Sequence, residues 1–306
     1  MSLQHQIQSR SKEAEEIVFR YLPEEKGYQK TVLEAMDYSV RAGGKRLRPV
    51  ILKAAYELCG GSGKLAEPFM AALEMIHSYS LVHDDLPEMD NDELRRGKPT
   101  THVQYGQAMA VLAGDGLLNY AYETALTAFS MAGADETERV IRALGILAKK
   151  AGVFGMVGGQ CLDVEAEKKE LSLSREELLF VYENKTAALL QAALLCGAVL
   201  GGAPEKTVKQ LEQAGYDLGI AFQLQDDILD IEGDEAELGK PIGSDERNGK
   251  RTYVSVLGLE EAKKEQERLS REAAELVAAI PAESGQQQEA REFLSGLIEY
   301  LVSRKS

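Results

Sequence analysis

Apolar residues recur at helical spacing along nearly the whole chain, and this periodicity restricts the possible fold more than any other feature. It predicts helices over about 4–21, 30–42, 49–59, 65–85, 107–131, 137–151, 153–168, 174–200, 205–231 and 254–302, the last with a break near 281–285. No segment has the two-residue alternation of a convincing strand. A chain of 306 residues without a Pro/Ser-rich linker is therefore expected to form a single all-α domain over residues 1–306.

An acidic cluster follows the apolar run 70–82, which has the character of a buried helix. Its five acids, within nine positions, are Asp84, Asp85, Glu88, Asp90 and Asp92. The C-terminal end of a helix already carries partial negative charge, so carboxylates gathered there need a cation. Mg²⁺ suits carboxylate oxygens best.

A second acidic cluster, Asp226, Asp227 and Asp230, lies far downstream on another apolar helical segment. A single cluster of this type is more often a solvated helix face. Two such clusters with apolar flanks predict two walls of one metal-filled cavity.

Polar positions continue away from both clusters along the same helical faces. His77 and Ser80 share a face with Asp84, and Gln223 and Gly219 share one with Asp226. A polar stripe on a buried helix is expected to line a cavity, and Gly219 is expected to let another element approach closely. For His77 a second interpretation stays open, in which His77 and Ser80 satisfy each other inside the core.

Basic residues could supply the positive charge that a phosphate needs. Lys45 and Arg48 lie in the turn GGKRLRP, and Arg95 and Arg96 follow the first acidic cluster. Arginine binds phosphate as a fork and lysine as a point charge. A solvated basic turn remains an alternative for the first group. Further candidates are Lys185 with Thr186, Lys240 and Lys250.

These groups together predict metal-assisted departure of a diphosphate from an apolar group.

The net charge of −15 argues against a nucleic-acid partner. Cys59, Cys161 and Cys196 lack metal-ligand spacing and are expected to be buried thiols of a cytoplasmic protein. No signal peptide is expected from the polar N-terminus. The Ala- and Gly-rich run 187–203 is expected to be a packed core helix rather than a membrane span.

Several motifs in order resemble those of the trans-isoprenyl diphosphate synthases, most closely the bacterial farnesyl diphosphate synthases, also called geranyltranstransferases. They are GGKRLRP, IHSYSLVHDDLPEMDNDELRRGKPTTH, GMVGGQCLD, NKTAALL, AFQLQDDILD and LGKPIGSD, within residues 40–255. The resemblance implies the isoprenoid synthase fold, a multi-helix bundle around a central cavity, as a homodimer. It implies head-to-tail condensation of isopentenyl diphosphate with an allylic diphosphate, and about three Mg²⁺ ions per active site.

The resemblance also implies a role for each matching residue. In the first acidic cluster Asp84 and Asp90 would ligate the metal, with Asp85 in support. In the second cluster Asp226 would do so, with Asp227 and Asp230 assisting. The residues that would bind the allylic diphosphate are Arg95, Lys185 and Lys240. Those that would bind isopentenyl diphosphate are Lys45, Arg48, His77 and Arg96. Thr186 and Gln223 would face the carbocation. Lys250 matches a lysine beside the metal–diphosphate site. Gln160 and Asp163 match positions near the cavity, without a step assigned. Glu88 is treated as loop filler, and Arg304-Lys305 could cover the cavity or be a frayed end.

The resemblance implies that product length depends on Tyr79 and Ser80, five and four positions before Asp84. At a rise of 1.5 Å per residue they lie about 6 to 7.5 Å deeper than the metal ligands. The bulk of Tyr79 predicts a floor that stops growth at the farnesyl chain, with a geranylgeranyl product as the alternative. Less favoured alternatives are a class I terpene cyclase, which normally lacks a full second DDxxD, and a non-catalytic partner subunit, which usually loses motif aspartates.

Overall fold

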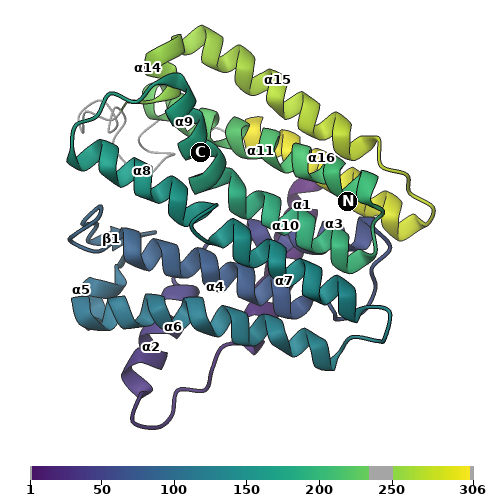
Figure 1. Cartoon of the computed structure of the whole chain (residues 1–306), viewed down its shortest axis with the longest axis horizontal. Coiled ribbons are helices and arrows are strands. Elements are labelled where there is room, and N and C mark those ends of the chain that lie inside the picture. The colour runs from purple at the N-terminus through teal and green to yellow at the C-terminus, as the bar shows by residue number, and fades with distance from the viewer. Residues whose placement is uncertain (1, 234–250, 304–306) are drawn as a thin grey trace. The chain divides into compact units, whose positions relative to one another are not determined.

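Helices make up nearly all of the regular structure in this computed structural model, which describes residues 2–233 and 251–303 (Figure 1). The all-α prediction is confirmed, and the helices begin and end close to the expected residues. The elements are α1 (Leu3–Arg20), α2 (Lys30–Arg41), α3 (Leu47–Leu58), α4 (Glu67–Asp84), β1 (Leu94–Arg95), β2 (Lys98–Pro99), α5 (Thr101–Tyr105), α6 (Gln107–Leu126), the 3₁₀ turn η1 (Thr127–Ser130), α7 (Thr137–Ala151), α8 (Met156–Lys168), α9 (Arg175–Val181), the π-helical turn η2 (Tyr182–Ala187), α10 (Ala188–Gly201), α11 (Glu205–Glu232), α14 (Tyr253–Leu257), α15 (Leu259–Ala278) and α16 (Gly285–Ser303).

The chain divides into two compact units. The first comprises Met1–Lys53 and Ser62–Leu144, and the second comprises Ala54–Gly61 and Gly145–Ser306. The first acidic cluster belongs to the first unit and the second acidic cluster to the second.

Helix α4 is the central element of the first unit. It is apolar almost all round, so most of its side chains are buried, and it runs beside α6 (Figure 1). Two glycines allow α6 to approach its neighbours. A β-carbon on Gly114 would lie 2.0 Å from the His83 imidazole, and one on Gly116 would lie 2.9 Å from the Met36 sulfur. These contacts explain the glycines within an otherwise regular helix.

Helix α10 is the centre of the second unit, and the residues from Ala188 to Leu200 are all buried. It packs against α11, which in turn packs along α15 (Figure 1). The one amide within the apolar sequence of α10 is satisfied: Gln191 Oε1 accepts from Lys150 Nζ at 2.7 Å, and Gln191 Nε2 donates to the Glu212 carbonyl at 3.2 Å. Among the described residues, the stretch Arg175–Gly201 is long and apolar enough to cross a membrane, but 83% of its most apolar window is buried. Burial agrees with the expected core helix.

The polar stretch 88–106, expected to be a loop, contains the β1–β2 hairpin and the short helix α5. Leu94 pairs with Pro99 and Arg95 with Lys98 in an antiparallel register. Arg96 and Gly97 form the turn with φ values of 54° and 75°, as a two-residue hairpin requires. Strands of two residues are too short for an alternating pattern, so the periodicity could not reveal them.

The expectation of three buried cysteines is wrong for Cys161. Cys196 is buried and Cys59 is half-buried, whereas Cys161 is exposed. Val157, Cys161 and Glu165 are four residues apart on α8 and share its exposed face. An apolar sequence neighbourhood therefore does not bury Cys161, because its helical position places it on the solvent-facing side.

Candidate active-site residues

The first acidic cluster begins where α4 ends. The chain then turns back on itself, so that the Asp90 N–H donates to the Asp84 carbonyl at 2.9 Å and the Met89 N–H donates to the Leu86 carbonyl at 2.9 Å. Two aspartates six positions apart thus become neighbours. Glu88 lies on the exposed side of this turn, in agreement with its interpretation as loop filler.

Asp85 is held by Arg95 of the hairpin. Arg95 Nε donates to the two carboxylate oxygens at 2.8 and 3.0 Å, and its Nη2 lies 2.5 Å from Oδ1. Asp85 is only 3% exposed, and this burial raises the pKa of its carboxyl group while Arg95 opposes the rise. The geometry is that of a forked arginine–carboxylate pair. It fixes the hairpin to the first acidic cluster.

His77 lies about two turns before the acids and lines a small cavity of 30 Å³ with Glu74, Arg95 and Arg96. Ser80 donates to the His77 backbone carbonyl at 3.0 Å. The alternative in which the two side chains satisfy each other is therefore not what the structure shows. Burial, followed by the charges of Arg48 and the neighbouring arginines, lowers the pKa of His77 well below its usual range. His77 is neutral at pH 7.

This depressed pKa predicts a pH-dependent stability. In the unfolded chain His77 binds a proton near pH 6.5, but in the folded chain it does not. The unfolded state therefore gains a proton as the pH falls from 7 to 5, and the free energy of unfolding decreases by up to about 1.4 kcal/mol per pH unit. Thermal unfolding of the wild type and of His77→Gln across this range tests the prediction. The difference between their midpoints should change with pH, and a constant difference would contradict it.

Tyr79 lies on α4 with 6% of its surface exposed. Its ring meets the His83 ring edge-on, with centroids 5.8 Å apart. Burial, with a smaller effect of Tyr122 on α6, raises the pKa of Tyr79 to about 12, so its hydroxyl stays protonated. The residue expected to form the cavity floor is thus a neutral, closely packed aromatic side chain.

The basic turn, residues 43–49 (GGKRLRP), runs into the first turn of α3, so that Lys45 precedes α3 and Arg48 is its second residue. Lys45 is exposed and Arg48 is half-buried. Burial lowers the pKa of Arg48 to about 10, which leaves it cationic at neutral pH, and its Nε has no hydrogen-bond partner in the structure. His77, Arg95 and Arg96 line the same small cavity, and the charge of Arg48 also acts on His77.

In the second unit, Lys185 and Thr186 lie in the π-helical turn η2, which interrupts the single helix expected over 174–200. Such turns often occur at functional sites. Two glycines make room for this turn: a β-carbon on Gly159 would lie 2.2 Å from the Lys185 amide nitrogen, and one on Gly219 would lie 2.0 Å from the Ala187 β-carbon. The expectation that Gly219 permits a close approach is confirmed.

A chain of hydrogen bonds joins this turn to the second acidic cluster. Thr186 Oγ1 donates to Gln223 Oε1 at 2.9 Å, and Gln223 Nε2 donates to Asp227 Oδ1 at 3.2 Å. Tyr182 donates its hydroxyl to Asp227 Oδ2 and accepts the Tyr253 N–H at 3.0 Å. Both oxygens of Asp227 therefore accept hydrogen bonds from side chains, so this carboxylate is fixed in place.

Other predicted residues of the second unit lie close by. Lys185 donates to Asp163 at 2.5 Å. Asp226 is half-buried, and Asp230 is 3% exposed on the same helix. Lys240 and Lys250, and the C-terminal Arg304-Lys305, lie outside the described residues.

The donor chemistry of the acidic clusters fits a hard divalent cation. Asp84 and Asp90 are neighbours in the first unit, and Asp226 and Asp230 share a face of α11 in the second. Within residues 2–233 and 251–303, no three His, Cys, Asp or Glu side chains converge as a complete ligand set. Mg²⁺ held by these residues would also need oxygen ligands from water or substrate phosphate, which it commonly takes.

Two residues that the sequence interpretation missed belong to these surroundings. Glu74 is 4% exposed and pairs with Arg46. Its signal in the sequence was an acid inside the apolar run 70–82, because glutamate is rarely fully buried unless it is paired. Tyr182 left no comparable signal, because an aromatic residue in an apolar helix is usually part of the core.

Comparison with known proteins places these features in context. The family model "Polyprenyl synthetase" matches residues 29–291. Farnesyl diphosphate synthase of Geobacillus stearothermophilus is 44% identical over 268 residues, 86% of this chain and 87% of the relative. Farnesyl diphosphate synthase of Bacillus subtilis (strain 168) is 47% identical over 247 residues, 81% of this chain and 82% of the relative. Geranylgeranyl diphosphate synthase of Cyanophora paradoxa is 46% identical over 244 residues and 80% of each chain.

Solved structures agree with the sequence matches. An FPP/GFPP synthase from Zymomonas mobilis has a TM-score of 0.85 at 30% identity and covers 98% of this chain and 99% of its own. A geranyltransferase from Helicobacter pylori, complexed with magnesium and isoprenyl diphosphate, has a TM-score of 0.81 at 31% identity and covers 98% of each chain. The fold is that of the all-α isoprenyl diphosphate synthases.

Proposed function

The chain belongs to the polyprenyl synthetase family and is a trans-prenyltransferase, and on this premise we propose that it makes farnesyl diphosphate. It would condense isopentenyl diphosphate head-to-tail, first with dimethylallyl diphosphate and then with geranyl diphosphate. The observation that carries the proposal is the hydrogen-bonded chain from Thr186 through Gln223 to Asp227. It links the two side chains expected to face a carbocation with an aspartate of the second acidic cluster.

One set of residues would bind the diphosphate that leaves the allylic substrate. Asp84, Asp90 and Asp226 would bind Mg²⁺, with Asp85, Asp227 and Asp230 in support, and Arg95, Lys185 and Lys240 would bind the allylic diphosphate. When bound, the metal ions supply the positive charge that stabilises the diphosphate as it departs. Lys185 and Arg95, now paired with Asp163 and Asp85, would add charge-assisted hydrogen bonds to the same group.

The second substrate would be held by Lys45, Arg48, His77 and Arg96. Once the allylic C–O bond breaks, the carbon–carbon double bond of isopentenyl diphosphate attacks the cation and a new C–C bond forms. The released pyrophosphate then accepts the proton that the product loses. Between C–O cleavage and C–C bond formation, oxygen atoms of Thr186 and Gln223 would stabilise the positive charge of the allylic cation. The proposed mechanism needs no protein nucleophile.

Two products are compatible with the family, and the buried Tyr79 favours the shorter one. A large, tightly packed side chain at this depth would leave no room for a fourth isoprene unit. The geranylgeranyl alternative rests on the similar identity of this chain to geranylgeranyl and farnesyl synthases.

The proposal extends to assembly and location. We place residues 1–306 in one catalytic domain, because one reaction needs both acidic clusters. Exposed apolar side chains on α6, among them Val111, Leu112 and Leu126, suit a homodimer interface. The three cysteines are free thiols, which suits the reducing cytoplasm.

Product analysis of the purified protein tests the function. With Mg²⁺, isopentenyl diphosphate and dimethylallyl, geranyl and farnesyl diphosphates as competing primers, mass spectrometry should show farnesyl diphosphate as the main product. A chelator should abolish turnover. Release of a hydrocarbon from one diphosphate without isopentenyl diphosphate would indicate a terpene cyclase, and no turnover without a second protein would indicate a partner subunit. A twenty-carbon main product would replace the farnesyl assignment with the geranylgeranyl one.

A further inference from the structure

Glu74 is a buried acid surrounded by basic side chains in the first unit. It is 4% exposed on α4, three residues before His77. Arg46 contacts it directly, and its charge also acts on Arg48 and Arg96. A carboxylate at this place reduces the positive charge of the very cluster that is proposed to bind a diphosphate. Electrostatic attraction alone would favour its absence, so its presence needs another explanation.

Arg46 is buried and has an unusual backbone conformation. It lies between Lys45 and Arg48 but is only 3% exposed, and its φ of 49° is in the left-handed region that most residues avoid. A non-glycine residue keeps this conformation when surrounding contacts enforce it, and such residues gather at functional sites. The strain lies at the centre of the basic turn.

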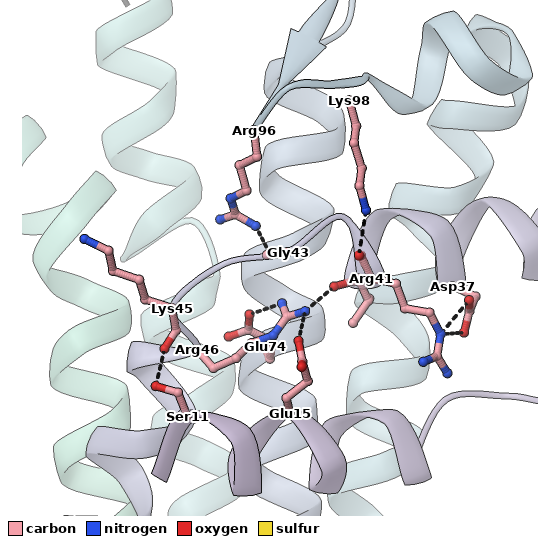
Figure 2. Close-up of polar contacts among 11 residues, drawn as sticks. Ser11, Glu15, Asp37, Arg41, Gly43, Lys45, Arg46, Glu74, Arg96 and Lys98 are labelled. Carbon is pink, nitrogen blue, oxygen red and sulfur yellow. Dashed lines mark hydrogen bonds and ion pairs between the residues drawn. The ribbon is translucent and has the colours of Figure 1, made fainter. Parts of the chain in front are cut away.

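The contacts that enforce this conformation come from the guanidinium group. Arg46 Nη1 donates to Glu74 Oε1 at 2.8 Å, and Nη2 donates to the Val40 carbonyl at 2.6 Å and to Glu15 Oε1 at 3.1 Å. Figure 2 shows the Arg46 side chain directed to Glu74 and Glu15, while Lys45 leaves the turn in a different direction. Burying Arg46 therefore determines where its neighbours in the turn are directed.

Other side chains hold this turn, and the end of α2 that precedes it, by backbone carbonyls. Ser11 donates to the Lys45 carbonyl at 2.9 Å, Arg96 donates to the Gly43 carbonyl, and Lys98 donates to the Arg41 carbonyl at 3.4 Å (Figure 2). These donors come from α1 and from the hairpin. The Arg46–Glu74 pair is the buried member of this set, so it is the one least able to exchange with water.

We propose that Arg46 and Glu74 are positioning residues that hold the basic turn in the conformation in which Lys45 and Arg48 bind isopentenyl diphosphate. The inference rests on the proposed function of that turn. Neither residue contacts the substrate in this scheme. A buried ion pair is often no more stabilising than apolar residues of similar size, so a gain in specific geometry is the better explanation for this one.

The sign of the effect of Glu74→Gln separates positioning from simple electrostatics. Removing a negative charge from the cluster would tighten diphosphate binding if charge alone mattered. Loss of the turn geometry would weaken it. We expect the Kd of isopentenyl diphosphate, measured by calorimetry, to rise about tenfold or more, because the neutral amide oxygen of glutamine holds the Arg46 guanidinium group more weakly than a carboxylate does and fixes the turn less well. The KM for the allylic diphosphate should change less than about twofold, because that substrate is assigned to other residues.

Two further variants complete the test. Arg46→Met combined with Glu74→Leu removes one charge of each sign, and apolar side chains can occupy the space, so the thermal midpoint should stay near that of the wild type while isopentenyl diphosphate still binds about tenfold more weakly. Asp37→Asn is the matched control, because Asp37 forms a surface pair with Arg41 near the same turn at 2.7 Å. It should leave the Kd within about twofold.

The outcomes separate the inference from the proposed function. If the wild type binds and condenses isopentenyl diphosphate, and Glu74→Gln binds it equally well or more tightly, the positioning role is overturned and the proposed function is not. A lower thermal midpoint with an unchanged Kd also overturns the positioning role, because the pair would then be structural. A wild type that neither binds nor consumes isopentenyl diphosphate overturns both proposals. Selective weakening in both Glu74 variants supports the inference.

Discussion

Replacing Asp226 by alanine is expected to lower kcat/KM about a thousandfold, equivalent to a loss of about 4 kcal/mol of transition-state stabilisation. Asp226 is half-buried on the face of α11 that also carries Gln223 and Asp230. Removal of this carboxylate leaves the departing diphosphate without one of the cations that would neutralise it. Asp84→Ala in the first acidic cluster should have an effect of the same size. Steady-state kinetics with geranyl and isopentenyl diphosphates measure both.

The chain offers a matched control for each variant. Asp217 is another buried acid of α11, with a hydrogen bond from Gln213 at 2.9 Å, but it lies outside the cluster. Glu88 is an exposed acid beside Asp84. Asp217→Asn and Glu88→Ala should keep activity within about threefold of the wild type. Near-normal activity in Asp84→Ala or Asp226→Ala would eliminate the metal-binding role proposed for that residue.

Loss of metal affinity should accompany the loss of activity. A carboxylate that binds Mg²⁺ makes activity depend on the metal concentration, so extra Mg²⁺ should partly restore turnover in Asp226→Ala. A residue whose loss only disturbs folding would show no such recovery. Activity measured over a range of Mg²⁺ concentrations, together with the thermal midpoint of each variant, distinguishes the two causes.

The helices could be predicted because their signal is local and repeated. Each long helix buries one face, so apolar residues recur at helical spacing, and the bounds of α7 were predicted to the residue. The start of α9 has a local signal of the same kind, a serine followed three residues later by a glutamate: Ser174 accepts the Glu177 N–H while Glu177 accepts the Ser174 N–H.

The π-helical turn could not be predicted, because its cause is not local. The sequence of 182–187 is compatible with an ordinary α-helix. The wider turn fits because Gly159 on α8 and Gly219 on α11 leave space on two sides. Gly219 was noticeable by itself, but the joint effect of the two glycines on Lys185 and Thr186 appears only when three helices pack together.

The residues of the candidate site could be proposed from residue type, but the pairing of their side chains could not be predicted. Nothing in the sequence indicated that Arg95 would bind Asp85 or that Lys185 would bind Asp163. These ion pairs join residues 10 and 22 positions apart. Partners of charged side chains depend on which loops meet in space, and the periodicity of single helices carries no such information.

Tyr79→Ala is expected to lengthen the product from farnesyl to geranylgeranyl diphosphate or beyond. Tyr79 is buried on α4, about 7.5 Å along the helix from Asp84, and packs edge-on against His83. Alanine removes the ring and leaves a cavity in the direction of chain growth. The surroundings of a buried aromatic side chain relax only partly after truncation, so much of that space should remain open to another isoprene unit.

Tyr79→Phe separates bulk from the hydroxyl group. The Tyr79 hydroxyl is protonated at neutral pH, because burial raises its pKa to about 12, so phenylalanine keeps both the size and the charge of the side chain. It should still make farnesyl diphosphate. Truncation to alanine also destabilises the fold by about 3 to 5 kcal/mol, so products are compared by mass spectrometry at a temperature where both variants are folded. Because a destabilised enzyme loses rate but does not by itself gain product length, longer chains from Tyr79→Ala alone identify Tyr79 as the floor, and an unchanged product from both variants rejects it.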